Sequence, residues 1–207
     1  MAERERFDQT ILEKIKTHAA TLVGIRHCKQ FAVCIPLLET NEGYGLLFEV
    51  RSAKIDRQPG DICFPGGMLE PGETAAKAAV RETCEELLVE ESSLELLGKM
   101  DTLVEDGGMV LHTFSAILKD YRGTYSEAEV ESVFIVPLQA LLKIEPERYY
   151  ITEHTVPDEN FPFHRIRNGR EYPWRKKREE VLFYPWKDKV IWGITAKLLE
   201  AFLETCR

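Results

Sequence analysis

Residues 64–89 read FPGGMLEPGETAAKAAVRETCEELLV, and this stretch carries most of what the sequence says about fold and chemistry. Its first part contains the pairs Pro65-Gly66 and Pro71-Gly72, which predict a loop with tight turns. Its second part, from about Thr74 to Leu87, is rich in alanine and glutamate and predicts a helix. The stretch therefore predicts a glycine-rich loop that leads directly into an acidic helix.

The predicted helix has two faces, since successive side chains are turned by about 100°. One face carries Glu82, Glu85 and Glu86 beside the small residues Ala75, Ala78 and Ala79. The opposite face is expected to pack inward and consists of Ala76, Val80, Thr83, Cys84 and Leu87. Carboxylates at this spacing repel one another, so a divalent cation among them explains the pattern better than solubility does. Oxygen ligands favour Mg²⁺ or Mn²⁺ over zinc. An ordinary acidic surface is the alternative for the three glutamates taken alone.

The order of the residues adds a more specific signal. Gly67, five residues, Glu73, seven residues and then Arg81-Glu82-Thr83-Cys84-Glu85-Glu86 follow the spacing of the Nudix signature, with Val89 at its final aliphatic position. The chain therefore resembles the Nudix hydrolases. Thr83 stands at a position that is usually aliphatic, so its hydroxyl group needs a backbone partner. Leu88 replaces a glycine that often ends the helix in the left-handed conformation, at a cost on the order of 1 kcal/mol.

This resemblance implies a fold of the α+β class. The expected architecture is an α/β/α sandwich with a central mixed sheet and a loop–helix–loop catalytic motif over residues 64–89. The implied activity is metal-dependent hydrolysis of a pyrophosphate bond in a nucleoside diphosphate derivative, with Mg²⁺ or Mn²⁺ as cofactor.

The resemblance also implies roles for individual residues. Glu82 and Glu86 would bind the metal directly, together with the carbonyl group of Gly66. Glu85 would bind a second ion or hold metal-bound water.

Three carboxylates remain candidates for the general base. Glu82 and Glu85 are two of them, and the third is Glu129, directly before a predicted strand. The alternative for Glu129 is an ordinary solvated position at the strand edge. Arg81 is expected to pair with Glu73 and to brace the loop against the helix.

A second motif lies upstream of the helix. The residues LLFEVRS (46–52), Gly60 and Phe64-Pro65-Gly66-Gly67 resemble the additional motif of the coenzyme A diphosphatases. Asp56 falls where that motif has its middle arginine, with Arg57 adjacent. The resemblance implies that Arg51, Arg57 and Gly67 contact the substrate, and arginine suits a phosphate group because it forms bidentate hydrogen bonds. The alternative is that the two arginines only keep a surface loop soluble.

Coenzyme A or acyl-CoA is therefore the leading substrate, with 3′,5′-ADP and (acyl-)4′-phosphopantetheine as products. ADP-ribose or a nucleotide sugar is the nearest alternative within the enzyme class. A catalytically silent nucleotide sensor is the alternative of another class, although the complete set of charged motif residues argues against it. A third alternative is an RNA-binding or decapping role that uses the basic segment 164–178.

The rest of the chain predicts a single domain over residues 1–207. A helical extension occupies residues 1–28, with a helix over 8–23. The expected strands cover residues 31–38, 44–50, 94–100, 111–118 and 130–136, and the expected later helices cover 138–142 and 188–205. Residues 160–187 are expected to form a hairpin around Asn168-Gly169 that covers the active site or a dimer interface. Trp192 is interpreted as a core residue, with stacking on a ligand as the alternative.

The composition of the chain restricts the kinds of binding partner and the cellular location that we expect. The formal net charge of −8 disfavours nonspecific nucleic-acid binding. The apolar stretches are too short to span a bilayer, and the charged residues 1–7 lack the apolar core of a secretion signal. The five cysteines show no CxxC spacing, which argues against a disulfide framework or a zinc site. We therefore expect a cytoplasmic protein with a small nucleotide substrate, no nucleic-acid or membrane partner, and a homodimer as an open option.

Overall fold

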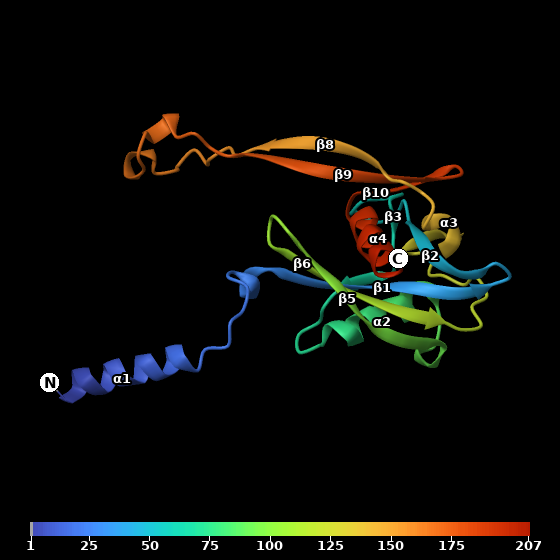
Figure 1. Ribbon diagram of the computed structural model, residues 1–207, viewed down its shortest axis with the longest axis horizontal. Helices are drawn as coiled ribbons and strands as arrows, with labels where there is room; N and C mark the ends of the chain where they lie inside the picture. The colour runs from blue at the N-terminus through green and yellow to red at the C-terminus, as the bar shows by residue number, and fades with distance from the viewer. Residues whose placement is uncertain (1) are drawn as a thin grey trace.

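A computed structural model describes residues 2–207, apart from the side chains of residues 2–5 and 26. Figure 1 shows how the helices and strands of this part of the chain are arranged. The α-helices are α1 (Ala2–Lys16), α2 (Ala75–Leu87), α3 (Leu138–Leu141) and α4 (Gly193–Thr205). The strands are β1 (Lys29–Thr40), β2 (Gly43–Arg51), β3 (Ile62–Cys63), β4 (Gly66–Met68), β5 (Leu94–Glu105), β6 (Met109–Leu118), β7 (Val130–Pro137), β8 (Glu147–His154), β9 (Lys176–Trp186) and β10 (Lys189–Trp192). Short 3₁₀ turns occur at Ile25–His27, Glu91–Ser93, Phe163–Arg165 and Gly169–Glu171.

The central sheet is mixed, as expected, and has seven strands. Its strand order is β3-β2-β1-β6-β5, with β4 also pairing with β1 and β7 also pairing with β2. β1 and β6 run parallel, whereas the other pairings within the sheet are antiparallel. The expected hairpin between the first two strands is present, since Thr40 pairs with Gly43.

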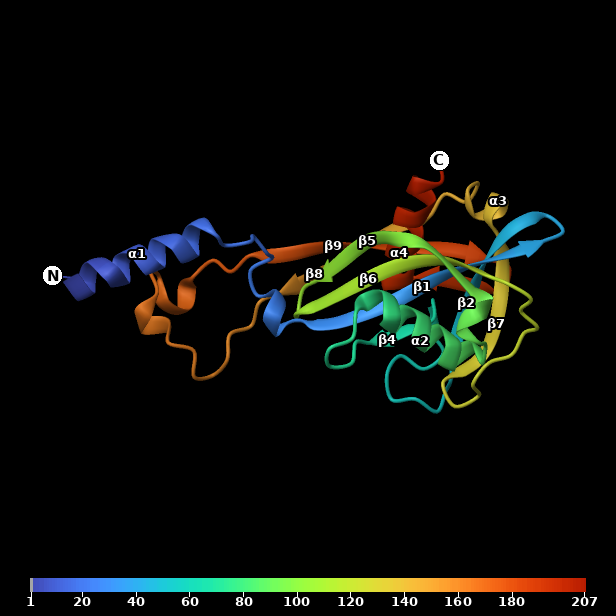
Figure 2. The same cartoon turned by 90° about the horizontal axis from the view of Figure 1, so that it is seen from below.

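Helices cover both faces of this sheet, α2 on one side and α4 on the other (Figures 1 and 2). Side chains along a strand alternate between the two faces. On β1, Ala32 and Cys34 pack against α2, whereas Ile35 and Leu37 belong to the larger core that contains α4. The expected α/β/α sandwich is therefore confirmed.

The buried side of α2 differs from the predicted one. Its buried residues are Ala78, Ala79, Thr83, Glu86 and Leu87. The inward face predicted from Ala76, Val80 and Cys84 is wrong, because these residues are only partly buried. The sheet beneath the helix presents the small side chains of Ala32 and Ala116, so the alanines of α2 pack closely against it.

Both departures from the Nudix signature have a clear structural outcome. The hydroxyl group of Thr83 donates a hydrogen bond to the carbonyl oxygen of Ala79, over 2.6 Å, so the buried hydroxyl has its backbone partner. Leu88 adopts the left-handed conformation, with φ 53° and ψ 50°, and ends the helix where glycine would be favoured.

A second sheet has the order β10-β9-β8 and contains the long hairpin of β8 and β9. Glu147 pairs with Phe183 at one end, and His154 pairs with Lys176 at the other. The predicted hairpin around Asn168 exists, but its first strand begins much earlier than residue 160. Asn168 lies in the long connection between the two strands, which extends away from the sandwich in Figure 1.

The two ends of the chain also differ from the prediction. The first helix covers residues 2–16 rather than 8–23, and it extends away from the sandwich (Figures 1 and 2). The last helix begins at Gly193 rather than 188, because residues 189–192 form β10 and pair with β9. Among residues 2–207, no helix has both the length and the apolar character needed to cross a bilayer.

Candidate active site

Two glycines set the distance between the loop and α2. A Cβ atom at Gly67 would lie 2.3 Å from the carboxyl carbon of Glu82. At Gly66 it would lie 2.4 Å from the carbonyl oxygen of Ala32. Gly66 has no room for a larger residue, because its neighbour is the backbone of β1, and a larger residue at Gly67 would displace the carboxylate of Glu82.

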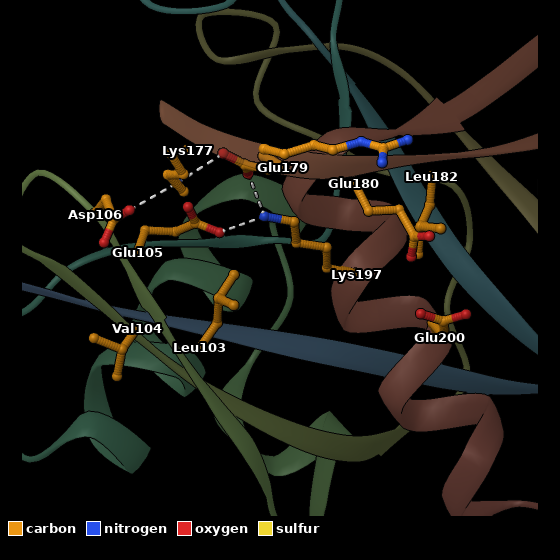
Figure 3. Close-up of a pocket in the computed structure, with 11 residues that line it drawn as sticks. Leu103, Val104, Glu105, Asp106, Lys177, Glu179, Glu180, Leu182, Lys197 and Glu200 are labelled. Atoms are coloured by element: carbon orange, nitrogen blue, oxygen red, sulfur yellow. Dashed lines mark hydrogen bonds and ion pairs between the residues drawn. The ribbon is translucent and has the colours of Figure 1, made fainter. Parts of the chain in front are cut away.

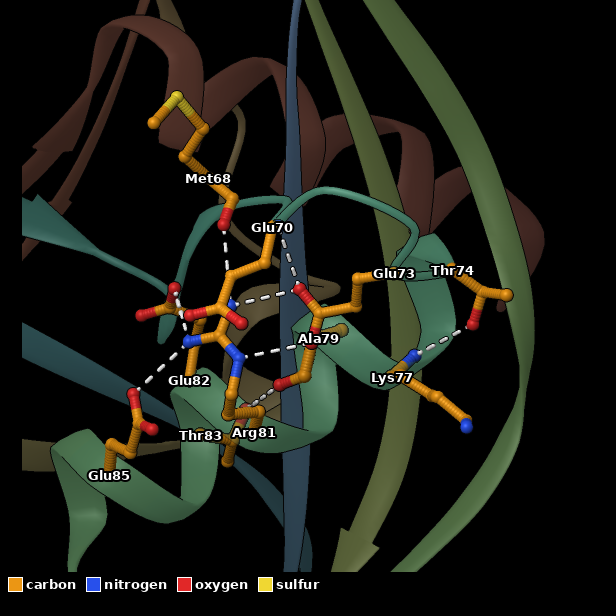
Figure 4. Close-up of polar contacts among 10 residues, drawn as sticks. All are labelled: Met68, Glu70, Glu73, Thr74, Lys77, Ala79, Arg81, Glu82, Thr83 and Glu85. Carbon is orange, nitrogen blue, oxygen red and sulfur yellow. Dashed lines mark hydrogen bonds and ion pairs between the residues drawn. The ribbon is translucent and has the colours of Figure 1, made fainter.

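Arg81 connects the loop to the helix, as Figure 4 shows. Its Nε and Nη2 atoms donate to the two carboxylate oxygens of Glu73, each over 3.0 Å. Its Nη1 atom donates to Glu82 over 2.8 Å and to Glu85 over 3.2 Å. The fourth contact is from Nη2 to the carbonyl oxygen of Met68, over 3.3 Å. The bidentate pair with Glu73 is the one that the resemblance implies.

Arg81 forms ion pairs with both Glu73 and Glu82, but the pKa values of these two carboxylates shift in opposite directions. The hydrogen bond from Arg81 lowers the pKa of Glu73 below its usual value. Burial raises the pKa of Glu82, and the contact with Arg81 only partly opposes this effect. Glu85 points outward, with its side chain 56% exposed, so Arg81 holds it at the rim of the site.

Glu86 lies deeper than the other carboxylates of the helix and is only 4% exposed. Its Oε2 atom accepts a hydrogen bond from the backbone N–H group of Gly66 over 2.8 Å. The pKa of Glu86 is raised to about 8, mainly by burial and also by the negative charges of Glu82 and Glu129, whereas the Gly66 contact and Arg51 oppose the increase.

Glu129 reaches this group from a different part of the chain. Its carbonyl oxygen accepts from the N–H group of Ser52, which fixes the start of β7 beside the end of β2. Its negative charge raises the pKa values of Glu82 and Glu86, so its carboxylate lies near both. The fold therefore brings Glu129 to the carboxylates of α2, although these residues are more than 40 positions apart in sequence.

The sequence-based reasoning missed Glu49, which lies on β2 and is only 1% exposed. Burial and the neighbouring Glu86 raise its pKa well above the usual value. Its Oε1 atom has no hydrogen-bond partner within the described part of the chain. The available signal was a single carboxylate in the middle of the apolar run from Leu46 to Val50, where a charged residue is costly without a partner.

The donor set fits a hard divalent cation. Glu49, Glu82, Glu86 and Glu129 supply carboxylate oxygens, and Gly66 lies within the same group. Mg²⁺ and Mn²⁺ prefer such oxygen ligands. Over residues 2–207, no three His, Cys, Asp or Glu side chains are already gathered as a ligand set. Instead, Arg81 donates a hydrogen bond to the carboxylate of Glu82, and the Gly66 N–H group donates one to the carboxylate of Glu86.

A cleft of about 570 Å³ lies on the other side of the Gly66–Gly67 backbone. Four predicted site residues line it, namely Arg51, Arg57, Gly66 and Gly67. Arg51 also acts on the carboxylates, because its positive charge lowers the pKa values of Glu49 and Glu86. Arg51 is therefore the residue that connects the cleft with the acidic group.

The remaining walls of the cleft come from β8, β9 and α4. Trp192 belongs to this lining and is 46% exposed, and it stacks on Phe183 with ring centroids 5.8 Å apart. Its interpretation as a core residue is therefore wrong. The reason is that β10 places it at the rim of the second sheet, where only one face of the ring is covered.

A network of ion pairs joins the second sheet to the sandwich (Figure 3). Lys177 contacts Asp106 over 2.7 Å and Glu179 over 2.9 Å. Lys197 of α4 contacts Glu105 and Glu179, each over 2.7 Å. The base of β9 is thereby tied both to the β5–β6 turn and to α4.

The basic segment 164–178 lies mostly outside the cleft. Arg170 is placed over the ring of Phe163, and Arg178 over the ring of Tyr150. Both arginines are exposed, and Lys177 is the member of the segment that takes part in the network of ion pairs. The RNA-binding or decapping alternative for this segment remains a prediction.

Comparison with known proteins identifies the family of the chain. The family model of the NUDIX domain matches residues 29–155. The peroxisomal coenzyme A diphosphatase of Mus musculus is 33% identical over 148 residues, which cover 69% of this chain and 62% of the mouse protein. A peroxisomal coenzyme A diphosphatase of Caenorhabditis elegans is 36% identical over 107 residues, or 50% of this chain and 46% of that protein.

A Nudix hydrolase of Photorhabdus laumondii is 28% identical over 156 residues, or 74% of this chain and 73% of that protein. The matched regions thus span less than two thirds of the two diphosphatases. The family model covers more than half of the chain and includes the loop, α2 and the strands around them. The chain belongs to the NUDIX domain family.

Proposed function

We propose that this protein hydrolyses the pyrophosphate bond of coenzyme A or acyl-CoA and releases 3′,5′-ADP and (acyl-)4′-phosphopantetheine. The position of Arg51 carries the proposal. Its guanidinium group lines the cleft and also lies close enough to act on the buried carboxylates. An anionic nucleotide in the cleft would therefore meet a cation directly beside the hydrolytic group. The two relatives named as coenzyme A diphosphatases support this choice of substrate.

The proposed chemistry depends on residues around α2. Glu82, Glu86 and the carbonyl group of Gly66 would hold Mg²⁺ or Mn²⁺, with Glu85 at the rim. When bound, such a cation neutralises charge on the pyrophosphate oxygens and acidifies water. Arg81 keeps the loop and the helix at a constant separation through Glu73, so the carboxylates are preorganised before substrate binds.

A proton must leave the attacking water, and a carboxylate must accept it. Glu129 is favoured by geometry, since it lies near Glu82 and Glu86 but is itself exposed. Glu82 is the second candidate, although its oxygen already accepts from Arg81. Glu85 is the least favoured, because its carboxylate points outward.

Recognition of the substrate is assigned to the cleft. Arg51 and Arg57 would contact phosphate groups, and Gly67 would allow the ligand to approach the backbone. The Nε atom of Arg51 donates to the carbonyl oxygen of Arg57 over 3.2 Å, which orients the guanidinium group. Apolar and aromatic side chains at the rim, including Ile151 and Trp192, suit the adenine ring or the pantetheine chain.

Turnover of three substrates, measured side by side with Mg²⁺ or Mn²⁺, tests this proposal. Coenzyme A, dephospho-coenzyme A and ADP-ribose would be supplied separately, and the products separated by chromatography. Fastest release of 3′,5′-ADP supports the diphosphatase. Faster hydrolysis of ADP-ribose would assign the same chemistry to a nucleotide-sugar substrate. Binding without hydrolysis of any of the three would instead support a nucleotide sensor.

The partners and the location follow from the same proposal. A small nucleotide is the expected ligand, with no nucleic-acid or membrane partner, and dimerisation remains a prediction. The cytoplasm is the location predicted from the sequence, whereas the mouse and nematode relatives are named as peroxisomal.

A further inference from the structure

Glu49 is a charged residue in an apolar environment. Leu47, two positions earlier on β2, belongs to a buried cluster with Leu87 of α2. Side chains two positions apart share a face of a strand. Glu49 therefore points to the α2 side of the sheet, where Glu86 lies one residue before Leu87. Its carboxyl group is within hydrogen-bonding reach of Glu86.

The protein itself supplies Glu49 with few partners. The thiol of Cys63 is 4.0 Å from its Oε2 atom, and Oε1 has no hydrogen-bond partner in the described part of the chain. The positive charge of Arg51 acts on it, but less strongly than burial and Glu86 do. A buried carboxylate in such surroundings is costly unless a cation or a shared proton compensates for its charge.

A divalent cation accounts for these surroundings better than a shared proton does. One proton neutralises one carboxylate, whereas Glu86 and Glu129 both act on Glu49 through like charges, and Glu82 and Glu129 act on Glu86. A divalent cation compensates for two of these charges and also provides a partner for the Oε1 atom of Glu49. All the donors are oxygen atoms, as Mg²⁺ and Mn²⁺ prefer.

We infer that Glu49 is an additional ligand of the divalent cation, which it binds together with Glu86. This inference rests on the proposed metal-dependent function, because it concerns the same site. It extends the ligand set from the loop and α2 to the central strand β2. The cation thereby bridges the catalytic helix and the sheet on which the helix packs.

Mn²⁺ binding to the full chain tests the inference without measuring catalysis. The affinity would be determined by electron paramagnetic resonance or calorimetry for the wild type, Glu49→Gln, Glu49→Asp and Glu86→Gln. We expect Glu49→Gln to weaken Mn²⁺ binding by about 10-fold or more, which is the effect typical of residues that support a metal site. Glu49→Asp keeps the charge but shortens the side chain, so we expect a smaller loss. Glu127→Gln removes the same charge at an exposed position and serves as the matched control.

Thermal unfolding separates metal binding from a structural role. Without metal, Glu49→Gln is expected to melt no lower than the wild type, because it replaces a buried carboxyl group whose ionised form is costly. With Mn²⁺, the increase in melting temperature is expected to be smaller than in the wild type. If Glu49→Gln melts lower without metal and binds Mn²⁺ normally, Glu49 is a structural residue and the inference is wrong.

The comparison with Glu86→Gln distinguishes this inference from the proposed function. Loss of Mn²⁺ binding in Glu86→Gln but not in either Glu49 variant leaves the proposed metal site intact and excludes Glu49 from it. If the wild type itself binds no Mn²⁺, the metal-dependent function fails together with the inference. If Glu49→Gln does not fold, the affinity of Glu49→Asp decides, and an unchanged affinity overturns the inference.

Discussion

Glu86 illustrates how a single residue carries both the packing and the chemistry of this site. It belongs to the buried side of α2, yet its carboxylate is held by one backbone N–H group and lies among other carboxylates. A residue placed only for stability would be apolar at this depth. The free-energy cost of burying the Glu86 carboxylate is explained if its negative charge is needed to bind the cation.

Glu86→Gln is expected to abolish activity while the fold is retained. Glutamine keeps the shape and one acceptor oxygen for the Gly66 N–H group, but it removes the negative charge. We expect the turnover number to fall by at least about 10³-fold, because charge stabilisation by the metal contributes several kcal/mol to the rate. Circular dichroism would check the fold, and Glu90→Gln, at an exposed position, is the control. Undiminished turnover would remove Glu86 from the metal site.

Leu88, directly after α2, has a backbone conformation that is unfavourable in free energy. Its positive φ angle is unfavourable for a residue with a Cβ atom, and its side chain is 59% exposed. Little buried surface therefore compensates for the unfavourable conformation.

Leu88→Gly is expected to stabilise the protein by about 0.5–1 kcal/mol, since glycine adopts the left-handed conformation freely. Urea unfolding would measure the difference. Leu88→Ala keeps the Cβ atom and is expected to leave the free energy of unfolding nearly unchanged. Equal effects of glycine and alanine would show that the backbone conformation is not the cause.

The elements of the second sheet show where sequence patterns were insufficient. The run Tyr149-Tyr150-Ile151-Thr152 has strong β-propensity, but its partner is β9, and 21 residues lie between the end of β8 and the start of β9. Turn residues at Asn168-Gly169 predicted a hairpin, yet they say nothing about how far the paired strands lie from the turn. The long connection between β8 and β9 places the turn residues Asn168-Gly169 far from the paired residues of the two strands.

The attachment of β9 is predicted to depend on pH. Lys197 and then Lys177 lower the pKa of Glu179 to about 2, below its ordinary value of 4.5. A group with a lowered pKa contributes stability above its unfolded value, and this contribution is lost as the pH falls through the folded value. Glu179→Gln is therefore expected to lower the melting temperature at pH 7, and the difference should shrink as the pH falls below 4.5.

Thermal unfolding of the wild type and Glu179→Gln between pH 7 and pH 3 would measure this effect. Glu171→Gln is the matched control, because Glu171 is exposed in the connection between β8 and β9. A difference that grows on acidification would mean that the ion pairs with Lys197 and Lys177 are not the source of the stability.

At the scale of the whole molecule, the cleft is made of residues from distant parts of the chain. Arg51 ends β2 and Arg57 follows it, Gly66 and Gly67 begin β4, and Trp192 ends β10. The sandwich supplies the carboxylates around α2, and the second sheet supplies the opposite wall of the cleft. The shape of the cleft therefore depends on how these two parts are held together, which includes the ion pairs of Lys177 and Lys197.

Arg51→Ala is expected to raise KM for coenzyme A by about 10-fold or more, the loss typical of a hydrogen bond to a charged group. KM for dephospho-coenzyme A should change little, since that compound lacks the 3′-phosphate that Arg51 is expected to bind. Lys54→Ala, which removes an exposed positive charge from the same loop, is the control. Equal losses with both substrates would show that Arg51 does not recognise the 3′-phosphate.

The sequence by itself determined the family and the acidic helix α2, because the motif residues lie within about 23 positions, and the family resemblance implied the pairing of Arg81 with Glu73. The hairpin of β1 and β2 was also predictable from its local turn. Only the tertiary structure decided which face of α2 is buried, because that depends on the small residues of β1 and β6 beneath the helix. It also brought Glu49 and Glu129 to Glu86 and moved Trp192 from the expected core to the rim of the cleft. Burial and like-charge contacts arise between residues distant in sequence, so local patterns do not contain them.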